Sequence, residues 1–168
     1  MTIRGRPDPT LSQHESLYEW AGLLSRARAG CVLVCQPQDD TRALMGELSA
    51  EALKIKGARG YLVDGGCRDT EFILELGFPV FHAFFTPSDI VGRWIPDRFA
   101  EPVTIGEVTI RTGDYVLGDR DGVVVIPAEL AEEAVTRTEA VAQTENLVRE
   151  AIRGGMDPVD AYLKYRKF

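Results

Sequence analysis

The chain has 168 residues, of which 45% are hydrophobic and 27% are charged, so it can build one globular domain with a sizeable core. This composition excludes disorder over the whole chain. Acidic side chains number 26 and basic ones 19, and the resulting net charge of −7 disfavours non-specific binding to nucleic acid or to an anionic membrane.

The side chains available for chemistry are limited in kind. The two histidines are too few for a site built on several imidazoles, which excludes most catalytic zinc sites. The odd number of cysteines predicts reduced thiols, as in a cytosolic protein. No stretch resembles a secretion signal or approaches the roughly 20 apolar residues of a membrane span. We therefore expect a cytoplasmic protein that works with oxygen ligands and arginine.

The first half of the chain alternates between helical and strand patterns. Residues 1–14 are polar and predict a poorly ordered arm or an edge strand. Apolar residues at helical spacing predict a helix over about 15–28, and the apolar run 31–35 predicts a buried strand. A second helix follows over about 43–57, and then a strand at 60–64.

This alternation continues and then changes. A glycine-rich turn at 65–69, a short helix at 70–76 and a strand near 79–83 complete a βαβαβ pattern, which implies parallel strands with crossover helices. From Pro87 onward, turn signals separate short strands that we expect to form antiparallel hairpins. These strands are 102–105, 108–110, 114–117 and 123–126. Residues 127–168 are predicted to form a long helix and a last short one, all within a single α/β domain spanning 1–168.

The segment from Asp64 to Asp69 follows a predicted strand, where open α/β sheets place their ligands. Its two glycines allow backbone N–H groups to converge, and Arg68 can grip a carboxylate with two hydrogen bonds. Asp69 offers a hard oxygen ligand for Mg²⁺ or Mn²⁺. In the simpler interpretation, Asp69 only caps the next helix and Arg68 is its ion-pair partner. The residues alone leave both interpretations open.

A second candidate segment lies near the start of the preceding helix. The backbone N–H groups around Gly46 could bind the other end of a small dicarboxylate, with Glu47 close to a metal. The alternative is an ordinary exposed glutamate in a first helical turn. The acidic stretch 113–122 is predicted to form turns, because Asp-Gly between two apolar runs is a hairpin signal. A nearby cation could lower the pKa of Cys67, but no histidine is placed to make it a nucleophile.

Five motifs occur in a specific order over about residues 27–155. They are Gly46-Glu47, Asp64 to Asp69, Leu76 to Phe81, Gly113-Asp114, and Asp119 to Pro127. Together they resemble the RraA-like family, named for a regulator of ribonuclease E, which also contains the 4-hydroxy-4-methyl-2-oxoglutarate aldolases. The resemblance implies an αββα fold related to phosphohistidine swivelling domains, with a mixed sheet, flanking helices and a long C-terminal helix. It also implies a homotrimer or hexamer whose active sites lie between subunits.

The resemblance also implies roles for individual residues. Asp69 matches the metal-ligating aspartate, and Arg68 matches the arginine that orients the 2-oxo acid and stabilises the enolate. Glu47 takes the place of an acid that positions metal-bound water. A glutamate from the C-terminal helix of the neighbouring subunit completes the site, and Glu145 is the first choice for it. The substrate-binding loop would be Gly46, Glu47, Leu48 and Ser49, and the fallbacks for Glu145 are Glu139 and Glu150.

The implied activity is a divalent-metal-dependent lyase that forms pyruvate from a 4-hydroxy-2-oxo acid, of the 4-hydroxy-4-methyl-2-oxoglutarate or 4-carboxy-4-hydroxy-2-oxoadipate type. Such a site would also decarboxylate oxaloacetate, because that reaction passes through the same enolate. The alternative is a non-catalytic protein that regulates a ribonuclease or helicase. Phe72 favours this alternative, because it occupies the position where the family's aldolase signature has an acid.

Overall fold

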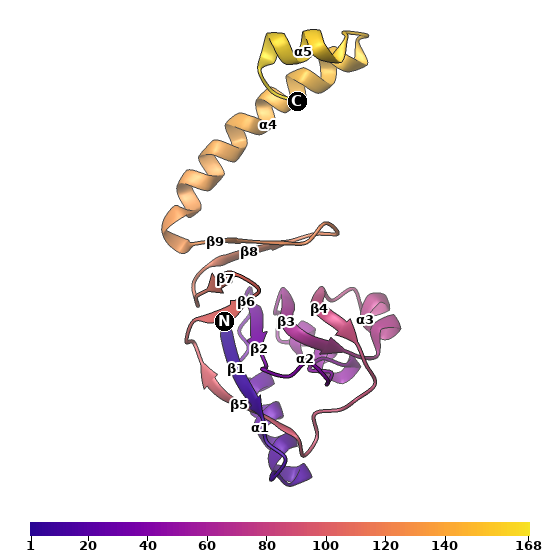
Figure 1. Cartoon of the computed structure of the whole chain (residues 1–168), viewed down its shortest axis with the longest axis vertical. Coiled ribbons are helices and arrows are strands. Elements are labelled where there is room, and N and C mark those ends of the chain that lie inside the picture. Colours follow the sequence, from indigo (N-terminus) through magenta and orange to yellow (C-terminus); the bar gives the residue numbers. More distant parts are fainter. The chain divides into compact units, whose positions relative to one another are not determined.

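The computed structural model describes all residues, 1–168, and the chain divides into two compact units, Met1–Val116 and Leu117–Phe168 (Figure 1). Each unit is described by itself. None of the helices combines the length and apolar composition that crossing a bilayer requires. The organisation as a single domain, expected from the chain length, stays a prediction.

A five-stranded sheet with the order β4-β3-β2-β1-β5 forms the centre of the first unit. The four strands β1 to β4 run parallel, and β5 runs antiparallel to β1 at the edge. The predicted parallel βαβαβ arrangement is therefore confirmed. The strands are β1 (Thr2–Pro7), β2 (Val32–Gln36), β3 (Gly60–Cys67), β4 (Val80–Phe85) and β5 (Trp94–Phe99), and the helices between them are α1 (Gln13–Ser25), α2 (Glu47–Ile55) and α3 (Thr70–Leu76).

The N-terminal segment is not the arm or edge strand that its polar composition suggested. β1 lies inside the sheet, where it pairs with β2 on one side and β5 on the other. The edge position belongs to β5, for which the sequence analysis predicted no strand. Ile3 is fully buried on one face of β1, and Gly5 is in contact with the indole of Trp94, which a Cβ at that position would overlap. Partner strands on both sides therefore order a segment that its own side chains do not mark as buried.

The main core lies between one face of this sheet and the three helices. Ile3, Cys35 and Val63 are aligned across β1, β2 and β3 and are all buried. They pack in one cluster with Trp20 and Leu23 of α1, and with apolar residues of α2 and α3. The helices thus cover this face, while the carboxyl ends of the parallel strands lead into the loops that carry the candidate site.

The opposite face carries an antiparallel hairpin of β6 (Val103–Ile105) and β7 (Val108–Ile110), as predicted. Thr2 and Val34 are register partners that alternate with the helix-facing residues, so they point to this side. The backbone N–H of Thr104 donates to the Gln36 side chain, and Thr2 shares a hydrogen bond with Thr112. The hairpin is therefore held by hydrogen bonds as well as by burial.

The second unit consists mainly of a hairpin and helices. β8 (Tyr115–Gly118), which begins just inside the first unit, pairs with β9 (Val123–Ile126), and the Asp119 carboxylate accepts backbone hydrogen bonds within the turn. A 3-10 turn, η1 (Ala128–Leu130), leads into α4 (Ala131–Arg153), and α5 (Pro158–Tyr165) packs against α4. The predicted fold class, a mixed α/β architecture with a long C-terminal helix, is confirmed.

Candidate active site

The predicted glycine-rich turn is partly strand. β3 continues through Gly65 and Gly66 to Cys67, and the Gly66 N–H donates to the carbonyl of Arg42 while the Gly66 carbonyl accepts from Leu44. A Cβ on Gly66 would lie 2.7 Å from the Arg42 carbonyl oxygen and from the Phe84 ring. The glycines therefore let neighbouring segments approach the strand closely, and the Gly66 N–H is not available to an anion.

Asp69 occupies the N-cap position of α3, but its side chain does not cap the helix. Its backbone is left-handed, with φ 54° and ψ 36°, a conformation that aspartate tolerates better than most residues. The carboxylate instead accepts the backbone N–H of Glu47, at 3.1 Å from Oδ2. The simpler interpretation, in which Asp69 only caps its own helix, does not describe this geometry.

Arg68 lies beside Asp69 and contacts both the segment before α2 and the loop after β4. Its backbone N–H donates to the carbonyl of Met45, 3.0 Å away. Its Nη2 lies 3.0 Å from Oδ2 of Asp89, and its Nε lies 3.8 Å from Oδ2 of Asp69. The guanidinium thus stands between two carboxylates, and the closer one comes from the loop after β4.

The start of α2 lies against this pair, as the sequence analysis expected. Gly46 is the N-cap of α2, and a Cβ there would lie 2.8 Å from Oδ2 of Asp69 and 3.0 Å from Nε of Arg68. Only a residue without a side chain leaves room for both groups. Glu47 meets Asp69 through its backbone, while its own side chain is exposed.

The other two residues of the predicted substrate loop make no hydrogen bond or ion pair with Arg68 or Asp69. The Leu48 side chain is 78% exposed. The Ser49 hydroxyl accepts a hydrogen bond from the indole of Trp20, 2.9 Å away on α1. The structure therefore brings together Gly46, Glu47, Arg68 and Asp69, and it directs Ser49 toward the helix layer.

A pocket of about 370 Å³ opens beside these groups. Its walls come from the end of β3, the start of α3 and the segment after β4: Cys67, Arg68, Asp69, Thr70, Phe85, Thr86 and Pro87. The guanidinium in this wall can bind an anionic group of a small molecule, and the carboxylate can bind a cation that an oxygen of the same molecule would coordinate.

The pKa of the Cys67 thiol differs from the sequence-based expectation. Instead of being lowered by the neighbouring guanidinium, the pKa of this thiol is raised to about 11. Burial is the main cause, because the side chain is almost fully removed from solvent. The thiol is therefore neutral at physiological pH, which agrees with its not being proposed as a nucleophile.

Asp69 fits a divalent cation only as a single-carboxylate site. No three histidine, cysteine, aspartate or glutamate side chains of the chain gather into a cluster that could hold a metal. Mg²⁺ commonly binds through one or two carboxylates and keeps several waters, so a lone partly exposed carboxylate suits it. Asp69 satisfies this requirement, since Oδ2 accepts one backbone hydrogen bond and the side chain faces the pocket.

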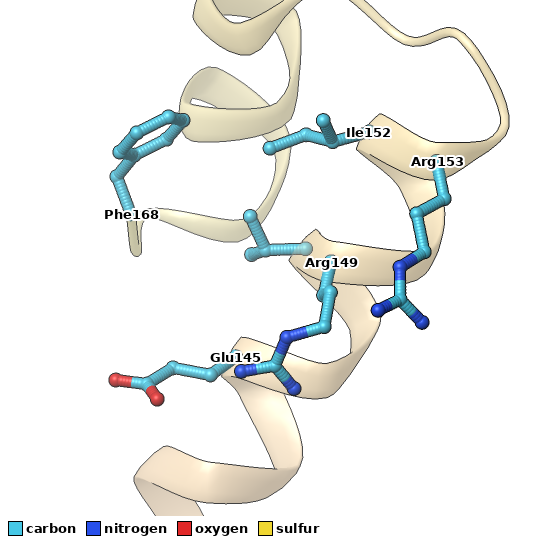
Figure 2. Close-up of a pocket in the computed structure, with 6 residues that line it drawn as sticks. Glu145, Arg149, Ile152, Arg153 and Phe168 are labelled. Atoms are coloured by element: carbon cyan, nitrogen blue, oxygen red, sulfur yellow. The ribbon is translucent and has the colours of Figure 1, made fainter.

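Glu145, the third predicted acid, belongs to the second unit. It lies on α4, where its carboxylate is 3.2 Å from Nζ of Lys167. Figure 2 shows it beside a pocket of about 540 Å³ that Arg149, Arg153 and Phe168 also line. Glu139 and Glu150 lie on the same helix and are exposed. The structure of one chain leaves the assignment of Glu145 to a neighbouring site as a prediction.

The sequence analysis missed the role of Asp89. None of the sequence motifs includes this residue, and none indicated its ion pair with Arg68. The available signal was topological: Asp89 follows β4, whose carboxyl end lies next to that of β3 in a parallel sheet.

Comparisons with known proteins identify relatives of this chain. The chain is 34% identical over 124 residues to the uncharacterised protein MJ0644 of Methanocaldococcus jannaschii, covering 68% of this chain and 55% of that protein. It is 32% identical to a Halalkalibacterium halodurans protein named as a candidate 4-hydroxy-4-methyl-2-oxoglutarate aldolase, covering 97% of this chain and 74% of the relative. The chain thus spans about half to three quarters of the length of these relatives.

Among solved structures, Streptomyces coelicolor RraAS2, described as an unusual member of the RNase ES inhibitor RraA family, superposes with a TM-score of 0.74. The two share 30% identity over 88% of this chain and 73% of RraAS2. The sequence model of the RraA-like family, described as Aldolase/RraA, matches residues 2–125. The chain therefore belongs to the RraA-like family.

Proposed function

We propose that this protein is a divalent-metal-dependent lyase that releases pyruvate from a 4-hydroxy-2-oxo acid and also decarboxylates oxaloacetate. The observation that carries the proposal is the carboxylate of Asp69, which is turned away from its own helix and lies beside Arg68 at a pocket. The aldolase name of the Halalkalibacterium halodurans relative supports the same reaction class.

Each residue of the site has a separate role in the proposed reaction. Arg68 binds the carboxylate of the 2-oxo acid and stabilises the negative charge that develops on the 2-oxo oxygen. Asp69 would hold Mg²⁺ or Mn²⁺, and the cation would supply Lewis-acid stabilisation of the enolate charge. Gly46 leaves space for both side chains, and the backbone N–H of Glu47 orients the Asp69 carboxylate.

The C4 hydroxyl must lose its proton as the C3–C4 bond breaks. The electron pair of that bond moves into the enolate, and C4 becomes the carbonyl carbon of the second product. We assign this proton transfer to a carboxylate, either the exposed Glu47 or the half-buried Glu145 of a neighbouring subunit, acting directly or through water. Protonation of the enolate at C3 then yields pyruvate. Decarboxylation of oxaloacetate needs only the enolate-stabilising groups, so it should depend on Arg68 and Asp69 and less on the carboxylates.

The test is pyruvate release from oxaloacetate and from 4-hydroxy-4-methyl-2-oxoglutarate, followed with a coupled lactate dehydrogenase. Turnover with Mg²⁺ or Mn²⁺ should disappear in EDTA, and Asp69→Asn should lower kcat/KM about 100-fold or more, because it removes the anionic ligand. Asp97→Asn is the matched control, since Asp97 is an exposed aspartate on edge strand β5. Turnover that survives chelation or the Asp69 substitution would disprove the proposal.

A second candidate function is regulation of a ribonuclease or helicase by binding. Phe72 favours it, because this side chain on α3 is 55% exposed, close in sequence to Asp69. The similarity to RraAS2 supports it too. The same assay separates the two functions: folded protein without metal-dependent turnover on either substrate favours the regulator.

A further inference from the structure

Arg68 has a closer anionic partner than the neighbouring Asp69. Its Nη2 lies 3.0 Å from Oδ2 of Asp89, against 3.8 Å between its Nε and Oδ2 of Asp69. Both aspartates are only partly exposed on their side chains, as is Arg68 itself. The Arg68–Asp89 contact is therefore the shorter of the two ion pairs.

Asp89 is itself held in place. Its Oδ1 accepts the backbone N–H of Val91 at 2.9 Å, which leaves Oδ2 for Arg68. One residue before it, the carbonyl of Ser88 accepts the N–H of Ala43, 2.8 Å away. One residue after it, the carbonyl of Ile90 accepts the hydroxyl of the fully buried Ser16. The backbone on both sides of Asp89 is thus anchored to the loop before α2 and to α1, and the Val91 N–H orients the carboxylate before any ligand binds.

This arrangement limits where the guanidinium can be. The Asp89 contact engages Nη2, the Asp69 contact is on Nε, and Nη1 has no hydrogen bond or ion pair. A planar guanidinium held at one edge presents its remaining N–H groups in a fixed direction. Without Asp89, the nearest anion to Arg68 would be Asp69, the residue needed for the cation.

We propose that Asp89 is a positioning residue: it holds Arg68 in the orientation that binds the substrate carboxylate and keeps Arg68 from closing onto Asp69. The inference rests on the proposed function of the Arg68–Asp69 site. Asp89 itself touches neither the substrate nor the cation, and it acts through Arg68.

The experiment compares wild type with Asp89→Asn. Asparagine keeps the size of the side chain and an oxygen for the Val91 N–H, and it removes the charge that pairs with Arg68. Oxalate, a planar mimic of the pyruvate enolate, is titrated by calorimetry in the presence of Mg²⁺, and KM and kcat are measured with oxaloacetate. The oxalate dissociation constant and KM should both rise about tenfold, with a smaller change in kcat.

Two further measurements separate positioning from structural damage. The thermal midpoint should stay at the wild-type value in Asp89→Asn, because asparagine keeps an acceptor for the Val91 N–H. The affinity for Mn²⁺ should fall, because Arg68 is then free to pair with Asp69. The matched control is Glu101→Gln, which removes the ion pair of Arg98 at the opposite edge of the sheet and should leave oxalate binding unchanged. Asp89→Glu, which restores the charge, should recover part of the affinity.

The outcomes are distinguishable. If wild type binds oxalate but releases no pyruvate, the proposed function fails, and the oxalate titration alone still tests Asp89. Unchanged or tighter oxalate binding in Asp89→Asn would overturn the positioning role, since tighter binding would mean that Asp89 only blocks Arg68. Wild type that does not bind oxalate would overturn it as well.

Discussion

Asp69 combines a left-handed backbone with a side chain that makes no capping hydrogen bond to α3. Such a backbone is unfavourable for a residue with a Cβ, by about 1 kcal/mol or more, and persists only where surrounding contacts hold it. The N–H of Glu47 and the guanidinium of Arg68 provide those contacts. The strain therefore has a use: it directs the carboxylate toward the start of α2 and the pocket.

Gly46→Ala should damage the site more than the fold. Its backbone, with φ −151°, suits any residue, so the added methyl group acts only through space. That methyl group would lie 2.8 Å from Oδ2 of Asp69, and the flexible ends of Asp69 and Arg68 would have to move. We expect kcat/KM to fall about tenfold or more, with a small change in thermal midpoint, measured by the pyruvate assay and by calorimetry.

Gly22→Ala is the matched control for this substitution. Gly22 lies within α1, and a Cβ there would meet nothing within 4 Å. Alanine in a helix should raise the free energy of unfolding slightly, by about 0.5–1 kcal/mol, and leave activity unchanged. Wild-type activity in Gly46→Ala would mean that the Arg68–Asp69 pair adjusts freely and that its close packing is unimportant.

At the scale of elements, the loop from Pro37 to Met45 connects β2 to the site. Its centre is Asp39, a buried carboxylate that accepts hydrogen bonds from Thr41 and from Arg42. Burial alone would raise the pKa of Asp39, but these hydrogen bonds outweigh it and the pKa is lowered. The loop then meets β3, because the Arg42 carbonyl accepts the Gly66 N–H.

The lowered pKa of Asp39 predicts a pH dependence of stability. A carboxyl whose folded pKa lies below its unfolded value stabilises the protein above about pH 4, and this contribution is lost as pH falls through the folded pKa. Asp39→Asn should lower the free energy of unfolding by about 1–3 kcal/mol at pH 7 and reduce the loss of stability below pH 4. Urea unfolding between pH 3 and pH 7 measures both.

Asp8 offers a matched comparison. Its carboxylate accepts the same kinds of hydrogen bond, from Thr10 and from Arg6, but at the surface. Asp8→Asn should therefore change stability less than Asp39→Asn, since solvent replaces the lost contacts. Equal effects of the two substitutions would show that burial does not strengthen the Asp39 network.

The elements that the sequence predicted well are those whose pattern is local. α3 ends at Gly77 in a left-handed conformation, and Asp157 caps α5, as their residue types indicated. The interior position of β1 and the existence of β5 depend on pairing between segments far apart in the chain, which no local pattern records. The same holds for the site: Arg68 and Asp69 come from one motif, whereas Asp89 reaches Arg68 only because β3 and β4 are neighbours in the sheet.

At the scale of the whole molecule, α4 needs a partner surface. It has 23 residues, yet only Val148 is buried, and Val135, Val141 and Leu147 remain exposed. Helices in proteins gain most of their stability from packing an apolar face. We expect a second copy of the chain to provide this surface, in agreement with the homo-oligomer that the family resemblance implies.

A site shared between copies makes a quantitative prediction. Arg68→Ala and Glu145→Gln should each lack lyase activity with a 4-hydroxy-2-oxo acid, because one removes the carboxylate anchor and the other the neighbour's proton acceptor. If each site takes Arg68 from one copy and Glu145 from the next, a co-expressed equal mixture should regain about one quarter of wild-type activity, the random fraction of sites with both native residues. The control is the same two proteins mixed only in the assay, without subunit exchange. Activity in Glu145→Gln alone would assign the proton transfer to Glu47, and no recovery in the mixture would place both groups within one copy.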